Sequence, residues 1–413
     1  MEIRTYVENI CREAKAASPR LALASTEEKN KLIAAFADEL LENTAYIIEE
    51  NDEDIKAARE NGLSEAMCDR LRLDEKRIGG IVNALRDLIS LPDPCGRGTV
   101  SRRPNGLDIE CVSVPLGCVG VIYEARPNVS ADIAGLCLKS GNACVLRGGK
   151  EAIHSNKAIV SCAHKALEAC GYPTALVSLI EMTEREGASV MMEMRGTLDV
   201  LIPRGGKGLI QHVVTSSKVP VIETGAGNCH IYIHRDCNVK KAISVAKNAK
   251  MSRPSVCNAV ETILVHADVA ETVLPLLSDA LEGCEIRGCE KTMQYISCTP
   301  ATSEDWEKEY NDYIAAVKVV SSLDEAIDHI NHYSTGHSEA IMTRSIAAAN
   351  EFTARVDSAC VYVNASTRFT DGGEFGLGAE VGISTQKLHA RGPMGLAALT
   401  TTKYIVRGDG QIR

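Results

Sequence analysis

Residues Arg253–Thr262 read RPSVCNAVET and place one cysteine, Cys257, between a basic residue and an asparagine. The proline and serine ahead of it are typical of a turn, and the β-rich run Ile263–His266 follows, so we expect the thiol where a loop enters a strand. Loop-held thiols beside cations ionise more easily, and the thiolate is the form that attacks carbon. Cys257 is therefore a candidate nucleophile. The alternative is that it is a small buried hydrophobe, one of 16 cysteines in the chain.

The composition argues against several classes of protein. A length of 413 residues exceeds one ordinary core and predicts two or three domains. The net charge is −10 and no basic block stands out, so nucleic acid and anionic membranes are poor candidate partners. The cysteines are scattered without a CxxC pair, the first 22 residues lack a secretory apolar core, and no apolar run reaches the length of a membrane span. We therefore expect a cytoplasmic protein with reduced thiols.

The pattern of apolar residues changes along the chain. Residues 1–92 carry them at helical spacing, and a linker rich in proline and glycine follows at 91–98. The β-rich segments Ile109–Val114 and Val119–Tyr123 are expected to form a hairpin or an arm. From Ala143 to Asn364 strands alternate with helices, which predicts an α/β fold with parallel sheets covered on both faces.

Two glycine-rich turns each stand between a predicted strand and a predicted helix. The first is Arg147–Lys150 (RGGK), and the second contains Gly205 and Gly206. The backbone N–H groups of such turns bind anions at the helix N-terminus, although similar turns also occur as plain connections. Neither turn has the Gly-x-Gly-x-x-Gly spacing or the Lys-Ser/Thr pair of a P-loop. The basic pair Arg147 and Lys150 suits a 2′-phosphate, which points to NADP rather than NAD.

Several polar residues allow both a structural and a functional interpretation. His230 and His234 resemble a metal motif, but residues four apart on a strand lie about 13 Å apart. Zinc bonds are only about 2.1 Å long, so we expect no metal. Asn128 is either a turn residue or the amide donor of an oxyanion hole. Glu223 is either a solvated charge or a general base. Arg368, in a glycine-rich loop, is either a structural residue or a ligand for an anion.

Long segments spread over nearly the whole chain resemble one known family. They read VPLG at 114–117, IYEARPN at 122–128, KSGNA at 139–143, LRGGKE at 146–151, IPRGG at 202–206, RPSVCNAVET at 253–262, LDEAIDHI at 323–330, YVNASTRFTDGG at 362–373 and FGLGAE at 375–380. By these segments the chain resembles the aldehyde dehydrogenase superfamily, and within it the γ-glutamyl phosphate reductase (glutamate-5-semialdehyde dehydrogenase) family.

The resemblance implies an aldehyde dehydrogenase-like α/β fold with three parts. These are a Rossmann-like cofactor domain of residues 1–106 and 121–224, an α/β catalytic domain of residues 225–385, and a β oligomerisation arm of residues 107–120 and 386–413. It also implies a homo-oligomer, with glutamate 5-kinase as a candidate partner.

The resemblance also implies roles for single residues. The nucleophile falls on Cys257 and the oxyanion amide on Asn128. A glutamate that binds the nicotinamide ribose falls near Glu309, and the superfamily's hydrolytic base falls near Glu223. Contacts to the adenosine phosphate of NADPH or NADP fall on Arg147, Gly148, Gly149 and Lys150. Arg126 and Arg368 are candidates for binding the phosphate or the α-carboxylate of the substrate.

The implied reaction belongs to proline biosynthesis. The Cys257 thiolate attacks the acyl carbon of γ-glutamyl phosphate, phosphate leaves, and NADPH reduces the resulting thioester to glutamate 5-semialdehyde. Two alternatives stay open. A hydrolytic NAD(P)-dependent aldehyde dehydrogenase would not require phosphate, and a non-catalytic relative would bind nucleotide without turnover.

Overall fold

The computed structural model describes residues 2–413, apart from the side chain of Ala66. The chain divides into two compact units. Unit 1 contains the residues up to Glu223 together with Gly376–Gly382 and Met394–Arg413, and unit 2 contains Thr224–Phe375 and Ile383–Pro393. The division after Glu223 lies one residue from the predicted end of the cofactor domain, whereas the C-terminal residues return to unit 1.

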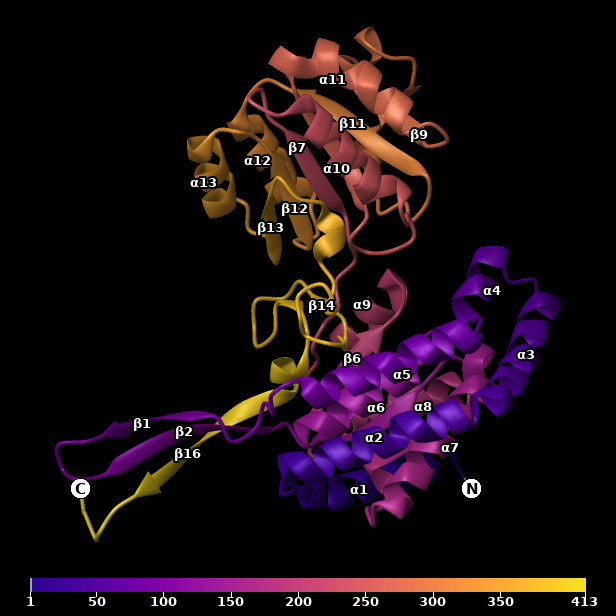
Figure 1. The fold of residues 1–413 in the computed structure, drawn as a ribbon, viewed down its shortest axis with the longest axis vertical. Helices are drawn as coiled ribbons and strands as arrows, with labels where there is room; N and C mark the ends of the chain where they lie inside the picture. The colour runs from indigo at the N-terminus through magenta and orange to yellow at the C-terminus, as the bar shows by residue number, and fades with distance from the viewer. Residues whose placement is uncertain (1) are drawn as a thin grey trace. The chain divides into compact units, whose positions relative to one another are not determined.

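Unit 1 begins with the helical region that the apolar spacing predicts (Figure 1). Its helices are α1 (Ile3–Ala22), α2 (Thr26–Glu42), α3 (Thr44–Glu60), α4 (Glu65–Leu71) and α5 (Glu75–Ser90). The α2 helix starts at a capping box, in which the Ser25 hydroxyl accepts from the Glu28 N–H and the Glu28 carboxylate accepts from the Ser25 N–H.

A four-stranded parallel sheet follows in unit 1, in the order β5-β4-β3-β6. Its strands are β3 (Cys118–Tyr123), β4 (Ala143–Arg147), β5 (Val177–Leu179) and β6 (Val200–Arg204). The intervening and following helices are α6 (Asn128–Ser140), α7 (Ile153–Ala169), α8 (Arg185–Glu193) and α9 (Lys207–Ser216). The chain runs outward from β3 to β5 and then returns to the other side of β3 as β6. The topology therefore reverses between β3 and β6, which is where open α/β sheets bind ligands.

Of the two alternatives for residues 109–114 and 119–123, a hairpin or an arm, the hairpin is wrong. Strand β2 (Asp108–Pro115) instead pairs antiparallel with β1 (Gly98–Arg102) on one side and with β16 (Thr400–Arg407) on the other. The turn at Gly117, with φ of 126°, carries the chain out of this three-stranded ribbon and into β3, which is parallel to β4 and β6. The ribbon thus includes β1, outside the predicted arm, and β3 is not part of it.

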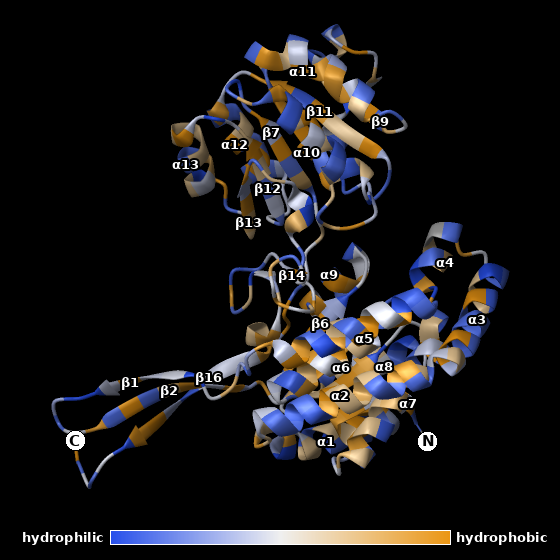
Figure 2. Cartoon of the chain, viewed as in Figure 1, coloured by the Kyte–Doolittle hydropathy of each residue, from blue (hydrophilic) through white to orange (hydrophobic). Residues whose placement is uncertain are grey.

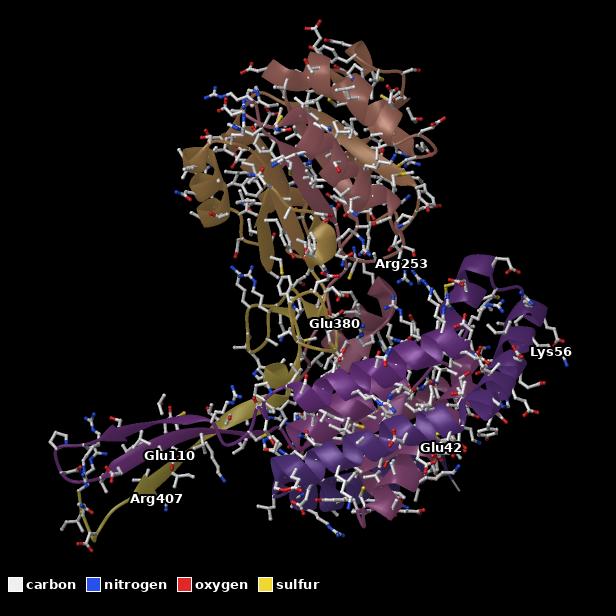
Figure 3. All side chains as sticks on the ribbon, in the orientation of Figure 1. Glu42, Lys56, Glu110, Arg253, Glu380 and Arg407 are labelled. Carbon is white, nitrogen blue, oxygen red and sulfur yellow. The ribbon has the colours of Figure 1, made fainter. Side chains whose placement is uncertain are left out.

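Within the part of the chain that the structure describes, the ribbon strands β1 and β16 each pair on one side only, and Glu110 and Arg407 project from the ribbon in Figure 3. Such open edges are templates for pairing with another chain. The expected homo-oligomer stays a prediction.

Unit 2 is a seven-stranded parallel sheet in the order β10-β9-β11-β8-β7-β12-β13, as the strand–helix alternation predicts. Its strands are β7 (Cys229–Ile233), β8 (Val260–His266), β9 (Glu285–Gly288), β10 (Thr299–Pro300), β11 (Ile314–Val320), β12 (Ser338–Met342) and β13 (Cys360–Val363), with the short pair β14 (Ile383–Ser384) and β15 (Gly392–Pro393) apart from them. Its helices are α10 (Val239–Met251), α11 (Ala267–Ala280), α12 (Leu323–Tyr333) and α13 (Ile346–Arg355).

Alternation along the strands assigns each face of the unit 2 sheet to its own helices. Ile231 and Ile233 pack with α10 and α11, whereas Tyr232 between them packs with α12 and α13. Figure 2 shows the strands as largely hydrophobic and the helices as two-sided. None of the described helices combines the length and the apolar character that a membrane crossing requires.

Candidate active site

The predicted site residues of unit 1 gather at one edge of its sheet. Arg126 and Asn128 follow β3, Arg147 ends β4, and Gly205 and Gly206 follow β6. Because the carboxyl ends of parallel strands meet at the same edge, these residues share the edge where the topology reverses. This is the position expected for a ligand in an open α/β sheet.

Asn128 is the first residue of α6 and not, as the sequence allowed, only a turn residue. Its Nδ2 donates to Oδ2 of Asp132 at 2.9 Å, while Arg126 two residues earlier is exposed. Ala125, just before Arg126, has a φ of 34°, which is unusual for a residue with a Cβ. The Ala125 N–H donates to Oε1 of Glu151 at 2.8 Å. This bond links the residue after the first glycine turn to the segment just before Asn128.

The second glycine turn already holds an anionic oxygen. The Gly206 N–H, at the start of α9, donates to Oε2 of Glu124 at 2.9 Å. A Cβ at Gly205 would lie only 2.4 Å from that same oxygen, so a side chain at this position would displace the Glu124 carboxylate. Sequence reasoning missed Glu124, since nothing local to Glu124 indicates that its carboxylate reaches a turn that follows a different strand.

Arg147 is partly buried beside the first turn. Its guanidinium donates to the carbonyl oxygens of Thr183 at 2.7 Å and Glu184 at 3.1 Å, and its buried Nε has no partner among the described residues. Burial lowers the pKa of Arg147, while the carboxylates of Glu151, Glu184 and Glu124 act in the opposite direction. Lys150 is exposed, and a Cβ at Gly148 would meet Nδ2 of Asn156 at 2.2 Å.

The predicted site residues of unit 2 lie near the amino ends of its parallel strands, whereas those of unit 1 lie at the carboxyl ends of its strands. Cys257 lies three residues before β8, Glu309 precedes β11, and Gly227 lies two residues before β7. Arg368 belongs to the 3₁₀ turn η5 (Thr367–Phe369), which returns to the same region. The Cys257 thiol is partly exposed, which a nucleophile requires and a core cysteine does not.

Glu309 contacts a glycine that lies against Cys257. Its Oε1 accepts from the Gly227 N–H at 2.8 Å, and Gly227 is in turn so close to Cys257 that a Cβ would lie 1.6 Å from the Cys257 carbonyl oxygen. The structure therefore gives Glu309 a contact with Gly227, which lies against the backbone of Cys257. The predicted contact with a nicotinamide ribose stays a prediction.

Glu261, inside the RPSVCNAVET stretch, anchors the segment that carries Glu309. Its Oε2 accepts from Nζ of Lys250 at 2.6 Å, with both side chains fully buried, and its Oε1 accepts from the Asn311 N–H at 3.2 Å. Burial raises the pKa of Glu261 to about 7, and the ammonium group of Lys250 opposes that shift. A buried carboxylate held this way is stable only while its partner remains.

Asn258, the residue after Cys257, forms hydrogen bonds with Arg368 and Thr370. Its Nδ2 donates to the carbonyl oxygens of Thr370 at 2.9 Å and Arg368 at 3.3 Å, and its Oδ1 accepts from the Arg368 guanidinium. Burial lowers the pKa of Arg368 and the charge of Arg253 lowers it further, whereas Asp371 and Cys257 raise it. Arg253, exposed after α10 (Figure 3), is a second cation of this site that sequence reasoning did not name as a ligand.

His230, His234 and Glu223 are the remaining candidates. His230 and His234 lie at β7, where His230 contacts Glu339 at 3.1 Å and His234 Nδ1 contacts Thr343 Oγ1 at 3.0 Å. Among the described residues there is no group of three or more metal-ligating side chains. Glu223 follows an isolated parallel bridge between Leu201 and Val221, and its role as a base stays a prediction.

Gly227→Ala is expected to lower turnover at least about tenfold and to lower the melting temperature. The new Cβ must displace the Cys257 backbone, and a shift of roughly 1 Å in a reacting group costs on the order of a hundredfold in rate. Initial rates and thermal melts check this. Gly80→Ala in α5, where a Cβ meets nothing within 4 Å, is the matched control. A Gly227→Ala enzyme with wild-type turnover would show that this contact does not hold the cysteine in place.

Comparison with known proteins agrees with the resemblance seen in the sequence. The aldehyde dehydrogenase family model matches residues 3–318 and 299–405. The γ-glutamyl phosphate reductase of Clostridium perfringens (strain SM101 / Type A) is 56% identical over 97% of this chain and 98% of its own, and that of Halothermothrix orenii is 52% identical over 100% of both. The crystal structure of γ-glutamyl phosphate reductase from Thermotoga maritima matches with a TM-score of 0.96 and 48% identity, covering 98% of this chain and 99% of that one. The predicted aldehyde dehydrogenase-like fold is confirmed, and the chain belongs to the γ-glutamyl phosphate reductase family of the aldehyde dehydrogenase superfamily.

Proposed function

We propose that this protein reduces L-γ-glutamyl phosphate to L-glutamate 5-semialdehyde and phosphate, with Cys257 as the nucleophile and NADPH as the reductant. The observation that carries the proposal is the environment of Cys257, just before β8. Cys257 is partly exposed, and its backbone lies against Gly227. On its other side, Asn258 holds the guanidinium of Arg368. A thiolate beside a held cation suits attack on a substrate that carries a phosphate.

The residues then act in sequence. The Cys257 thiolate attacks the acyl carbon, and the amide of Asn128 with the Cys257 backbone N–H stabilises the oxyanion that forms. The carbon–oxygen bond to phosphate breaks, and Arg368 with Arg253 neutralises the departing phosphate, which leaves a thioester on the sulfur. When bound, the cofactor supplies a hydride to that thioester. The resulting thiohemiacetal releases the aldehyde and returns the sulfur as the thiolate.

The chain offers fitting groups for a nucleotide with a 2′-phosphate. The Nε of Arg147 is a buried donor without a partner among the described residues, and exposed Lys150 adds a second charge. At the second turn, the Glu124 carboxylate on the Gly206 N–H stands in for an anionic oxygen, which supports a pyrophosphate contact there once Glu124 moves away. Arg147, Gly148, Gly149, Lys150, Gly205 and Gly206 are thus proposed to hold NADPH.

Arg147→Ala is expected to raise KM for NADPH by about 10- to 100-fold, because a charge-assisted bond to a phosphate contributes roughly 1.5–3 kcal/mol. KM for NADH should change little, since NADH lacks the 2′-phosphate. Arg147 also braces the carbonyls of Thr183 and Glu184, and loss of that brace affects both cofactors alike. The ratio of the two KM values is therefore the measurement, with Lys165→Ala on α7 as a control for lost charge. Equal changes in both KM values would refute the contact with the 2′-phosphate.

A phosphate requirement separates the proposal from the hydrolytic alternative. The reverse reaction is run with glutamate 5-semialdehyde and NADP⁺, with and without inorganic phosphate. We expect NADPH to form only when phosphate is present, because phosphate and not water then resolves the thioester. Equal rates in both samples would favour a hydrolytic aldehyde dehydrogenase, and cofactor binding without turnover would favour a non-catalytic relative.

A further inference from the structure

We propose that Asp132 is a positioning residue, whose carboxylate orients the Asn128 amide so that one N–H points to Asp132 and the other remains for the oxyanion. This inference rests on the proposed function, because it assigns Asp132 a role only through Asn128. Asp132 lies outside the glycine turns and the cysteine stretch on which the sequence prediction depended.

The geometry lies within one helix. Asn128 begins α6 and Asp132 stands four residues later, so the two side chains are neighbours on the same face. The Nδ2 of Asn128 donates to Oδ2 of Asp132 at 2.9 Å, a normal length for a charge-assisted bond. Both residues belong to unit 1, so the contact does not depend on unit 2.

The chemistry of the contact determines which end of the amide faces which way. An ionised carboxylate accepts hydrogen bonds and donates none, so it selects the NH₂ end of Asn128. The terminal torsion of asparagine is broad and roughly two-fold, so an unheld amide also samples the flipped state. In that state the amide oxygen would face the developing oxyanion and repel it. The bond to Asp132 therefore favours the one orientation in which the amide can donate.

Asp132 lies on a closely packed helix, and two neighbouring groups favour its ionised form against the effect of burial. Its chain neighbours Ala131 and Ile133 are fully buried, and the α6 helix is packed closely enough on Leu85 of α5 that a Cβ at Gly135 would clash at 2.2 Å. Burial raises the pKa of Asp132 to about 6, while the bond from Asn128 and the charge of Arg204 lower it. At neutral pH the carboxylate form therefore predominates, which is the form that orients the amide.

A double-mutant cycle tests the proposal. Asp132→Ala is expected to lower kcat for phosphate-dependent oxidation of the semialdehyde about 10-fold, with KM changed less than about twofold. In an Asn128→Ala background the same substitution should change kcat less than about twofold, since no amide remains to be oriented. Asp132→Asn keeps the volume and offers an amide oxygen to the same N–H, so it should recover part of the loss. Asp52→Ala, an exposed acid on α3, is the control for lost charge.

Each other result counts against the proposal in a distinct way. Unchanged kcat in Asp132→Ala would overturn it, as would an equal loss in both backgrounds, which would show a structural role independent of Asn128. If Asp132→Ala melts early, Asp132→Asn replaces it in the cycle, and the same comparison decides. Retained activity in Cys257→Ser would instead refute the proposed function itself, whatever Asp132 does.

Discussion

Cys257→Ser is expected to lower phosphate-dependent formation of NADPH from glutamate 5-semialdehyde by more than about a thousandfold. The hydroxyl keeps the shape of the side chain but does not ionise near neutral pH, so the species that attacks carbon is lost. The hydrogen bonds of the Gly227 N–H and of the Asn258 side chain do not involve the sulfur, so the residues around Cys257 should stay in place. Initial rates of NADPH formation measure the effect.

The control for Cys257→Ser is another partly exposed cysteine. Cys170 is the C-cap of α7 in unit 1 and has no assigned role, so Cys170→Ser should retain full turnover. Cofactor affinity and melting temperature should match those of the wild-type protein in both variants. Wild-type turnover in Cys257→Ser would exclude this sulfur as the nucleophile and remove the thioester from the mechanism.

Local sequence was sufficient to predict where the site residues lie relative to strands. Gly148 and Gly149 follow a strand, Gly205 and Gly206 precede a helix, and Cys257 stands just before β8. These positions were predictable because glycine turns and strand-forming runs act over a few residues. The same reasoning predicted the alternation of strands and helices in unit 2.

Contacts between distant segments were not predictable in this way. Strand β2 pairs with β16 from the other end of the chain, with Asp108 opposite Arg407, and no local pattern encodes that partner. Pairing with the nearer segment at 119–123, one of the two alternatives that the sequence left open, was therefore natural but wrong. The carboxylates of Glu124 and Glu309, which bind the Gly206 and Gly227 N–H groups, likewise act on turns far from them in sequence.

Asn128→Ala is expected to lower kcat by about 10²–10³-fold, or on the order of 3 kcal/mol of barrier, because one oxyanion donor is lost. The donated bond gains strength only as negative charge develops, so kcat and kcat/KM should fall by the same factor and KM should stay nearly constant. Steady-state kinetics with the semialdehyde, phosphate and NADP⁺ measure both parameters.

The split between kcat and KM decides what Asn128 does. Asn61→Ala, which removes an exposed amide that donates to the Ala57 carbonyl at the end of α3, should change neither parameter. If Asn128→Ala raises KM while kcat holds, the amide binds the ground state and the oxyanion must be stabilised by backbone N–H groups alone. If neither parameter changes, Asn128 serves the start of α6 and no reacting atom. Because Asp132 acts only through this amide, its role would then disappear with that of Asn128.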